Sequence, residues 1–182
     1  MVCADLEKLR SEVTAIAELT NFSRASLIPV LRQIKEKYRG IDSEAMQLVA
    51  DVLGMHPVEV EAVATFYAFL LPQVQGRFVF RLCRTYSCEL AGKEEGAAQL
   101  RHELGVDFGE MSTDGAFSLE WGNCMGMCDQ GPALLVNEEV YARVTPAKVS
   151  DRDAGYRKRL EDEAAGKVAH DGPAGMDVAD IK

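Results

Sequence analysis

The sequence lacks a surplus of basic residues and lacks any long apolar run. Its 20 lysines and arginines stand against 29 aspartates and glutamates, a net charge of −9. Because nucleic-acid binding requires a basic surface, we expect no nucleic-acid partner. The longest apolar stretch, "AVATFYAFLL" from Ala62 to Leu71, has ten residues, whereas a membrane-spanning helix needs about 20. We therefore expect no direct insertion into a membrane.

Several chemical motifs are missing as well. The chain has neither a G-x-G-x-x-G turn nor a G-x-x-x-x-G-K-[ST] loop, so we expect no nucleotide site of its own. It has no C-x-x-C pair, which disfavours a thiol–disulfide enzyme. No charged-then-apolar leader opens the sequence. We therefore expect a cytoplasmic protein, in a reducing compartment where cysteines are more often metal ligands or catalysts than disulfides.

The first part of the chain has the three-and-four periodicity of amphipathic helices. Length and an apolar content of 47% allow a proper core. We expect about four helices over residues 5–70, with Ser43 as the N-cap of the third and Gly54 at its end. Pro57 suits the first position of the fourth helix. This pattern predicts an N-terminal helical segment over residues 1–72.

From Gly76 the period changes to the alternation of strands. "RFVFRLC", the segment 117–121 and the pair "PALLV" and "VYARV" predict strands, the last two joined by a short connection at "NEE". Residues 89–104 return to a helical pattern, and a last helix begins at Thr145 and Pro146. The order β-α-β-β-β-α predicts a small α/β domain over 73–160, followed by a C-terminal extension over 161–182.

Four of the five cysteines form two loosely spaced pairs. Four residues separate Cys83 from Cys88, and three separate Cys124 from Cys128. Cys83 is expected at the end of a strand and Cys88 just before a helix. Cys124 follows another strand, and Cys128 precedes the hairpin. If these strands share a sheet, the two loops meet at one edge and build a four-thiolate site.

Three occupants of such a site compete. Structural zinc takes four tetrahedral thiolates, usually with shorter gaps within each pair. An iron–sulfur cluster also takes four thiolates, and a [2Fe–2S] core is wider than one ion, so looser pairs suit it. Gly122, Gly126 and Gly131 bracket the second pair and allow backbone N–H groups to approach sulfur. The cluster is favoured, while zinc, paired disulfides and free core cysteines stay open at this point.

Residues outside the two pairs have weaker claims. Arg84 follows a predicted ligand directly, and its cation would stabilise the more negative, reduced cluster, although a solvent-facing arginine is an equal alternative. Cys3 stands apart in the N-terminal segment and is interpreted as a small apolar or surface residue. His56 fits a helix start, and His102 fits a solvated helix face. We assign no catalytic residue.

Several stretches resemble a known family in sequence and order. They are "LIPVLRQIKEKY", "VADVLGMHPVEVEAVATFYAFL", "CRTYSC" and "DGAFSLEWGNCMGMCDQGPALLVNEEVYARVTP". Over roughly residues 25–150 they look like the 24-kDa subunit family of NADH:quinone oxidoreductase (respiratory complex I). These are thioredoxin-like [2Fe–2S] ferredoxins, which include matching subunits of NAD(P)-linked hydrogenases and formate dehydrogenases. The resemblance implies an α+β or α/β fold, in which a helical segment precedes a thioredoxin-like domain with a small mixed sheet.

The resemblance also implies a function. Cys83, Cys88, Cys124 and Cys128 would bind the iron of one [2Fe–2S] cluster, close to the FMN of a larger flavoprotein that also binds NAD(P). The chain would carry one electron at a time within an NAD(P)H-linked oxidoreductase complex, electron-bifurcating or not, that holds further iron–sulfur subunits. By itself the chain would oxidise no nucleotide. The alternative hypothesis is a zinc-stapled interaction module.

Overall fold

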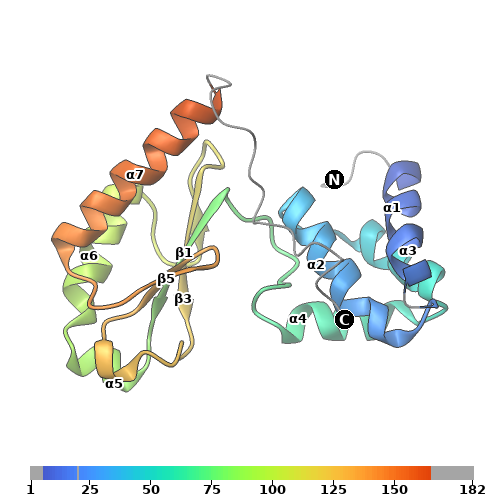
Figure 1. The fold of residues 1–182 in the computed structure, drawn as a ribbon, viewed down its shortest axis with the longest axis horizontal. Coiled ribbons are helices and arrows are strands. Elements are labelled where there is room, and N and C mark those ends of the chain that lie inside the picture. The colour runs from blue at the N-terminus through green and yellow to red at the C-terminus, as the bar shows by residue number, and fades with distance from the viewer. Residues whose placement is uncertain (1–5, 20, 165–182) are drawn as a thin grey trace. The chain divides into compact units, whose positions relative to one another are not determined.

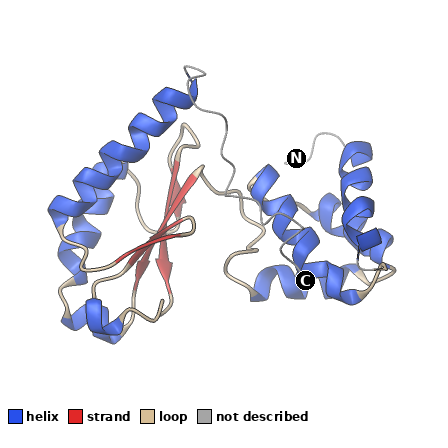
Figure 2. Cartoon of the chain, viewed as in Figure 1, coloured by secondary structure: helices blue, strands red, loops and turns tan. Residues whose placement is uncertain are grey.

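The chain folds into two compact units, Met1–Val74 and Gln75–Lys182. The computed structural model describes residues 6–19 and 21–164. The first unit is built of helices alone within its described part, and the second combines a sheet with helices (Figure 2). Helices joined to a mixed sheet confirm the predicted fold class.

Amphipathic helices build the first unit around one apolar core. Leu9, Val13, Leu31 and Val49 are fully buried within it and come from the predicted stripes. A short 3-10 turn at Arg24–Ser26 precedes the second helix. The α-helices of this unit are α1 (Leu6–Leu19), α2 (Leu27–Tyr38), α3 (Ser43–Leu53) and α4 (Pro57–Phe66).

The ends of α3 and α4 test the predicted caps. The predicted N-cap of α3 was wrong by one residue: Asp42 is the cap, and its Oδ1 accepts a hydrogen bond from the Ala45 N–H at 2.9 Å. A side-chain oxygen in that position satisfies an N–H group that the helix leaves unpaired. Gly54 ends α3 in the left-handed conformation with φ +62°, and Pro57 opens α4, as predicted.

A five-stranded mixed sheet forms the centre of the second unit. Its order is β2-β3-β1-β4-β5, with β1 and β3 parallel and the other neighbours antiparallel. The sequence analysis missed β2, a two-residue exposed strand too short to show alternation. The strands are β1 (Phe78–Cys83), β2 (Glu110–Met111), β3 (Phe117–Gly122), β4 (Leu134–Val136) and β5 (Glu139–Tyr141).

Helices α6 (Lys93–Leu104) and α7 (Pro146–Ala164) pack side by side (Figure 1). Phe80 and Phe117 from the sheet join Leu100 and Tyr156 from these helices in the core. The Thr145 hydroxyl accepts the Lys148 N–H at 3.4 Å, in keeping with the predicted helix start. This packing holds the sheet in which β1 ends at Cys83.

Two predicted boundaries in this unit differ from the structure. The single helix predicted over 89–104 is two helices, α5 (Tyr86–Leu90) and α6, separated by Gly92 with φ +83°. Helix α7 continues to Ala164, and the rest of the predicted C-terminal extension lies outside the described residues. Over the described ranges, no helix combines the length and apolarity that a membrane crossing demands.

Candidate metal centre

The parallel pairing of β1 and β3 brings the two cysteine-bearing loops together. Cys83, the last residue of β1, is in register with Gly122, the last residue of β3. The Arg84 N–H then donates to the Gly122 carbonyl at 2.9 Å. Because parallel strands end at the same edge of a sheet, Cys124 emerges beside Cys83, as the sequence analysis expected.

The two cysteine pairs differ in their surroundings. We name Cys83 and Cys88 the inner pair, since each is only 1% exposed, and Cys124 and Cys128 the outer pair, since both are exposed. Cys88 lies inside α5 rather than before a helix, which corrects its predicted place. In the outer pair the two sulfur atoms are 3.3 Å apart.

Hydrogen bonds connect the two loops at the sulfur atoms. The Cys83 sulfur accepts the backbone N–H of Met125, which lies in the outer loop. The Cys88 sulfur accepts the N–H of Ala133, just after that loop. The Ser87 hydroxyl in turn contacts the Cys128 sulfur. These contacts bring the two cysteine-bearing loops together at the sulfur atoms.

These contacts shift the acidity of the thiols in opposite directions. Burial alone would raise the pKa of Cys83, but the Thr85 hydroxyl and backbone N–H groups hold that pKa below its usual value. Burial raises the pKa of Cys88, and the neighbouring Cys83 sulfur raises it further. The Cys124 sulfur raises the pKa of Cys128. Of the thiols at Cys83, Cys88 and Cys128, only that of Cys83 has its pKa shifted toward the deprotonated form.

Two glycines give the backbone close access to sulfur. A Cβ on Gly131 would lie 3.2 Å from the Ala91 Cβ and 3.5 Å from the Cys88 sulfur. Gly126 has φ +81°, and its N–H is 3.5 Å from the Cys124 sulfur. The loop therefore approaches the sulfurs as the glycine pattern predicted, and Gly131 leaves space that a side chain would fill.

The sequence matches the thioredoxin-like [2Fe–2S] ferredoxin family over residues 13–152. This chain belongs to that family. Subunit 2 of the NADH-quinone oxidoreductase of Thermus thermophilus is 38% identical over 81% of this chain and 83% of its own length. A subunit of the NADH-quinone oxidoreductase of Escherichia coli is 34% identical over 74% of this chain and 81% of its own length.

A solved structure agrees on the fold. A chain of an NAD⁺-reducing [NiFe]-hydrogenase in the air-oxidised state superposes with a TM-score of 0.65 over 74% of this chain, at 22% identity. The match spans only 23% of the hydrogenase chain, so the likeness concerns one part of that protein. The zinc-stapled module, the alternative that the sequence left open, gains no support from these relatives.

The donor set fits the family's [2Fe–2S] cluster. The four sulfurs form two pairs, Cys83 with Cys88 and Cys124 with Cys128, and a two-iron core takes two thiolates on each iron. Backbone N–H groups of Met125, Ala133 and Gly126 point at sulfur, and such donors stabilise the negative charge of a thiolate-bound cluster.

Other predicted residues lie outside this contact network. Arg84 is exposed, and within the described part of the chain its side chain has no hydrogen bond or ion pair. His56 caps α4, as predicted, and His102 lies exposed on α6. Cys3 falls outside the described residues. The sequence analysis missed Thr85 and Ser87, whose hydroxyl groups lie within "CRTYSC" and were therefore visible as candidate donors.

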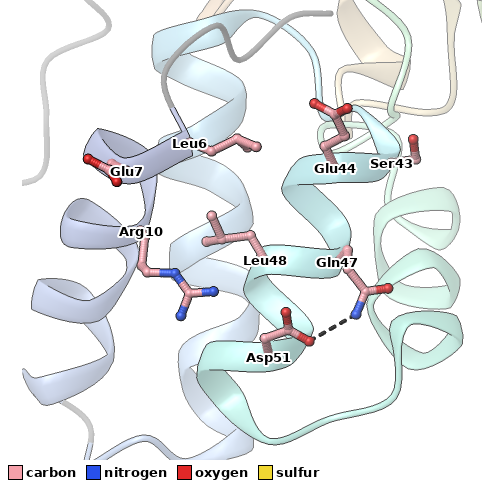
Figure 3. Close-up of a pocket in the computed structure, with 8 residues that line it drawn as sticks. All are labelled: Leu6, Glu7, Arg10, Ser43, Glu44, Gln47, Leu48 and Asp51. Carbon is pink, nitrogen blue, oxygen red and sulfur yellow. Dashed lines mark hydrogen bonds between the residues drawn. The ribbon is translucent and has the colours of Figure 1, made fainter.

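The helical unit has a pocket of its own between α1 and α3 (Figure 3). Its volume is about 430 Å³, and Gln47 donates to Asp51 at 2.9 Å along one side. Six of the eight residues that line it carry charged or polar side chains, and none of the eight is a cysteine. Nothing in this pocket adds a ligand to the metal centre.

Proposed function

We propose that this chain is the [2Fe–2S] electron-transfer subunit of a flavin-containing, NAD(P)H-linked oxidoreductase complex. The family match over residues 13–152 is the observation that carries the proposal. Two relatives are named as subunits of NADH-quinone oxidoreductases, and the structural neighbour belongs to an NAD⁺-reducing hydrogenase. The chain acts in the cytoplasm, in soluble form or at the periphery of its complex.

Cys83, Cys88, Cys124 and Cys128 hold the cluster in this proposal. The contacts that join the inner and outer pairs support the assignment, as do the N–H donors from both loops. The bound cluster supplies one-electron chemistry. The chain's own residues bury the inner pair, donate hydrogen bonds to sulfur and leave the outer pair open to a partner.

A flavoprotein is the partner that this chemistry requires. A hydride delivers two electrons at once to a flavin, and a cluster beside the flavin takes or stores one of them. FMN and the NAD(P) site therefore belong to the partner, and further iron–sulfur subunits continue the electron path. Exposed apolar side chains at and just after the C-terminal end of α4, Phe66 at 78% and Phe69 at 47% exposure, offer one contact surface.

Analysis of metal and sulfide tests the cofactor. Anaerobically prepared full-length protein should contain two irons and two acid-labile sulfides per chain, be red-brown, and show an EPR signal only after reduction. Stoichiometric zinc without sulfide would overturn the proposal. An assay with purified chain and an artificial acceptor should show no oxidation of NADH. Turnover without any flavoprotein would contradict the assignment of the FMN and NAD(P) sites to the partner.

The C-terminal residues serve assembly in this proposal. Deleting residues 161–182 should leave the cluster spectrum intact and weaken binding to the flavoprotein, as measured by co-purification or calorimetry. The deletion removes the last turn of α7 as well, so a second variant that ends at Ala164 separates helix from tail. Loss of the cluster with unchanged partner binding would place these residues in the domain core instead.

A further inference from the structure

Thr85 occupies a helix cap but does not use its side chain as one. It is the N-cap residue of α5, where a threonine hydroxyl ordinarily accepts a hydrogen bond from a nearby helix N–H. Its side chain makes no such bond. The hydroxyl lies instead 3.1 Å from the Cys83 sulfur. The Thr85 hydroxyl thus contacts sulfur instead of capping the helix.

The chemistry of the sulfur decides the direction of this bond. In a free thiol, either the S–H or the O–H group is able to donate. A sulfur that binds iron carries no proton, so the Thr85 hydroxyl is then the donor. The same hydroxyl also contacts the Cys88 sulfur. Thr85 therefore reaches both sulfurs of the inner pair.

Burial makes this contact strong. Both inner cysteines are 1% exposed, and Thr85 itself is half-buried. Water screens an interaction of this kind weakly, because the effective dielectric constant inside a protein is far below that of bulk water. Arg84, the adjacent residue, carries a full charge but extends into solvent. A neutral hydroxyl in the interior should thus influence the inner pair more than the exposed cation.

We propose that Thr85 sets the reduction potential of the cluster by donating a hydrogen bond to the Cys83 sulfur. This inference rests on the proposed function, since it assumes a [2Fe–2S] cluster on the four cysteines. The reduced cluster carries one more negative charge than the oxidised cluster, and part of that charge resides on the ligating sulfurs. A donor to sulfur therefore stabilises the reduced form more and raises the potential.

The test is a redox titration of the full-length chain with its cluster, followed by EPR under anaerobic conditions. Thr85→Val replaces the hydroxyl with a methyl group of similar shape, whereas Thr85→Ser keeps the hydroxyl. Thr85→Ala removes the hydroxyl without adding a methyl group. Thr14→Val is the matched control, because the Thr14 hydroxyl donates to the Arg10 carbonyl within α1, in the other unit.

We expect Thr85→Val and Thr85→Ala to make reduction about tenfold less favourable, which equals about 59 mV for one electron. Thr85→Ser and Thr14→Val should titrate like the wild type. Resonance Raman spectra supply an independent readout: deuterated solvent should shift Fe–S(Cys) stretching bands less in Thr85→Val than in the wild type.

Three results would overturn the inference. Equal potentials in all variants would show that the hydroxyl does not act on the cluster. A potential lowered equally in Thr85→Ser, which keeps the hydroxyl, would show that the shift does not depend on the hydroxyl. Loss of the cluster from both Val and Ala variants, with retention in Ser, would assign the hydroxyl to assembly instead. If the wild type itself binds no [2Fe–2S] cluster, the proposed function fails, which is a separate outcome.

Discussion

The inner and outer cysteine pairs both contribute sulfur atoms, but they differ in secondary structure and in burial. The inner pair comes from the end of a central strand and from a short helix, and it is buried. The outer pair lies in the loop that follows β3, where both residues are exposed. A strand and an α-helix hold the inner sulfurs, whereas the outer sulfurs come from glycine-containing loop backbone and from the short 3-10 turn Cys128–Gln130. One cysteine pair is thus buried, and the other is exposed.

Of the tests of this comparison, replacing one of the four cysteines should change the cluster content most. Changing any of the four cysteines to Ala should abolish or cripple cluster assembly, since one of the two irons then loses one of its two thiolates. Serine variants separate the pairs: Cys124→Ser should retain more cluster than Cys83→Ser, because an exposed loop adjusts to the shorter bond of an oxygen ligand. Iron and sulfide contents measure the outcome.

Cys3→Ala is the control for these variants and should bind a full cluster. Loss of cluster in Cys3→Ala would show that the ligand set is wrong. Equal cluster contents in Cys83→Ser and Cys124→Ser would remove the distinction between a rigid pair and an adaptable pair.

Alkylation of the cluster-free chain should show the next largest difference. Cys124 and Cys128 are exposed and should react with iodoacetamide much faster than Cys83 and Cys88, which are buried. Mass spectrometry of the separate peptides gives the individual rates. The lowered pKa of Cys83 favours its reactive thiolate form, so first reaction at Cys83 would mean that acidity outweighs access in this site.

Two glycine substitutions should produce smaller and unequal effects. Gly131→Ala places a methyl group against Ala91 and the Cys88 sulfur, and overpacking of this kind costs about 1–3 kcal/mol. Gly126→Ala meets nothing within 4 Å but has φ +81°, a left-handed conformation that costs roughly 1 kcal/mol. Urea unfolding and cluster content should show that Gly131→Ala is the more damaging change.

Gly105→Ala provides a matched control on backbone strain. Gly105 ends α6 with φ +67°, has open space around it and lies outside the cysteine loops. It should lose stability much as Gly126→Ala does while keeping its full cluster. A Gly131→Ala variant as stable and as cluster-rich as the wild type would show that the inner pair tolerates rearrangement.

Arg84→Glu should have the smallest effect. A cation next to a ligand favours the reduced cluster, so reversing its charge should lower the potential. Because Arg84 is exposed, solvent screening should keep this shift below that of Thr85→Val. Titrations at low and high salt check the mechanism, since a screened charge loses its influence as salt rises. An unchanged reduction potential at low salt would show that the Arg84 side chain has no influence on the cluster.

Periodicity in the sequence predicted those parts of the fold that depend on burial. Apolar residues repeat at helical spacing in α1 to α4 and alternate along β1 and β3. The structure confirms these elements. Local choices between neighbouring polar groups were harder to predict. Asp42 and Ser43 are both good caps, and only the backbone geometry shows that Asp42 accepts the bond.

Predictions about the site had a similar limit. Cysteine spacing indicated four ligands at one sheet edge, and the parallel register of β1 and β3 brings the two loops there. Which neighbours donate to sulfur depends on the path of each loop. Arg84 was an obvious candidate because it carries a charge, yet the hydroxyl of Thr85 is the group that reaches Cys83. A one-residue difference along a strand end reverses the direction of a side chain.

The parallel pairing of β1 with β3 also has a consequence for the order of maturation. Its partners are far apart along the chain and joined through α5, α6 and β2, so this pairing forms slowly compared with local hairpins. Until it forms, the two loops have no common edge and the nascent chain offers only separate cysteine pairs. Iron and sulfide should therefore bind after the sheet has formed. Once bound, they should stabilise the pairing of β1 with β3.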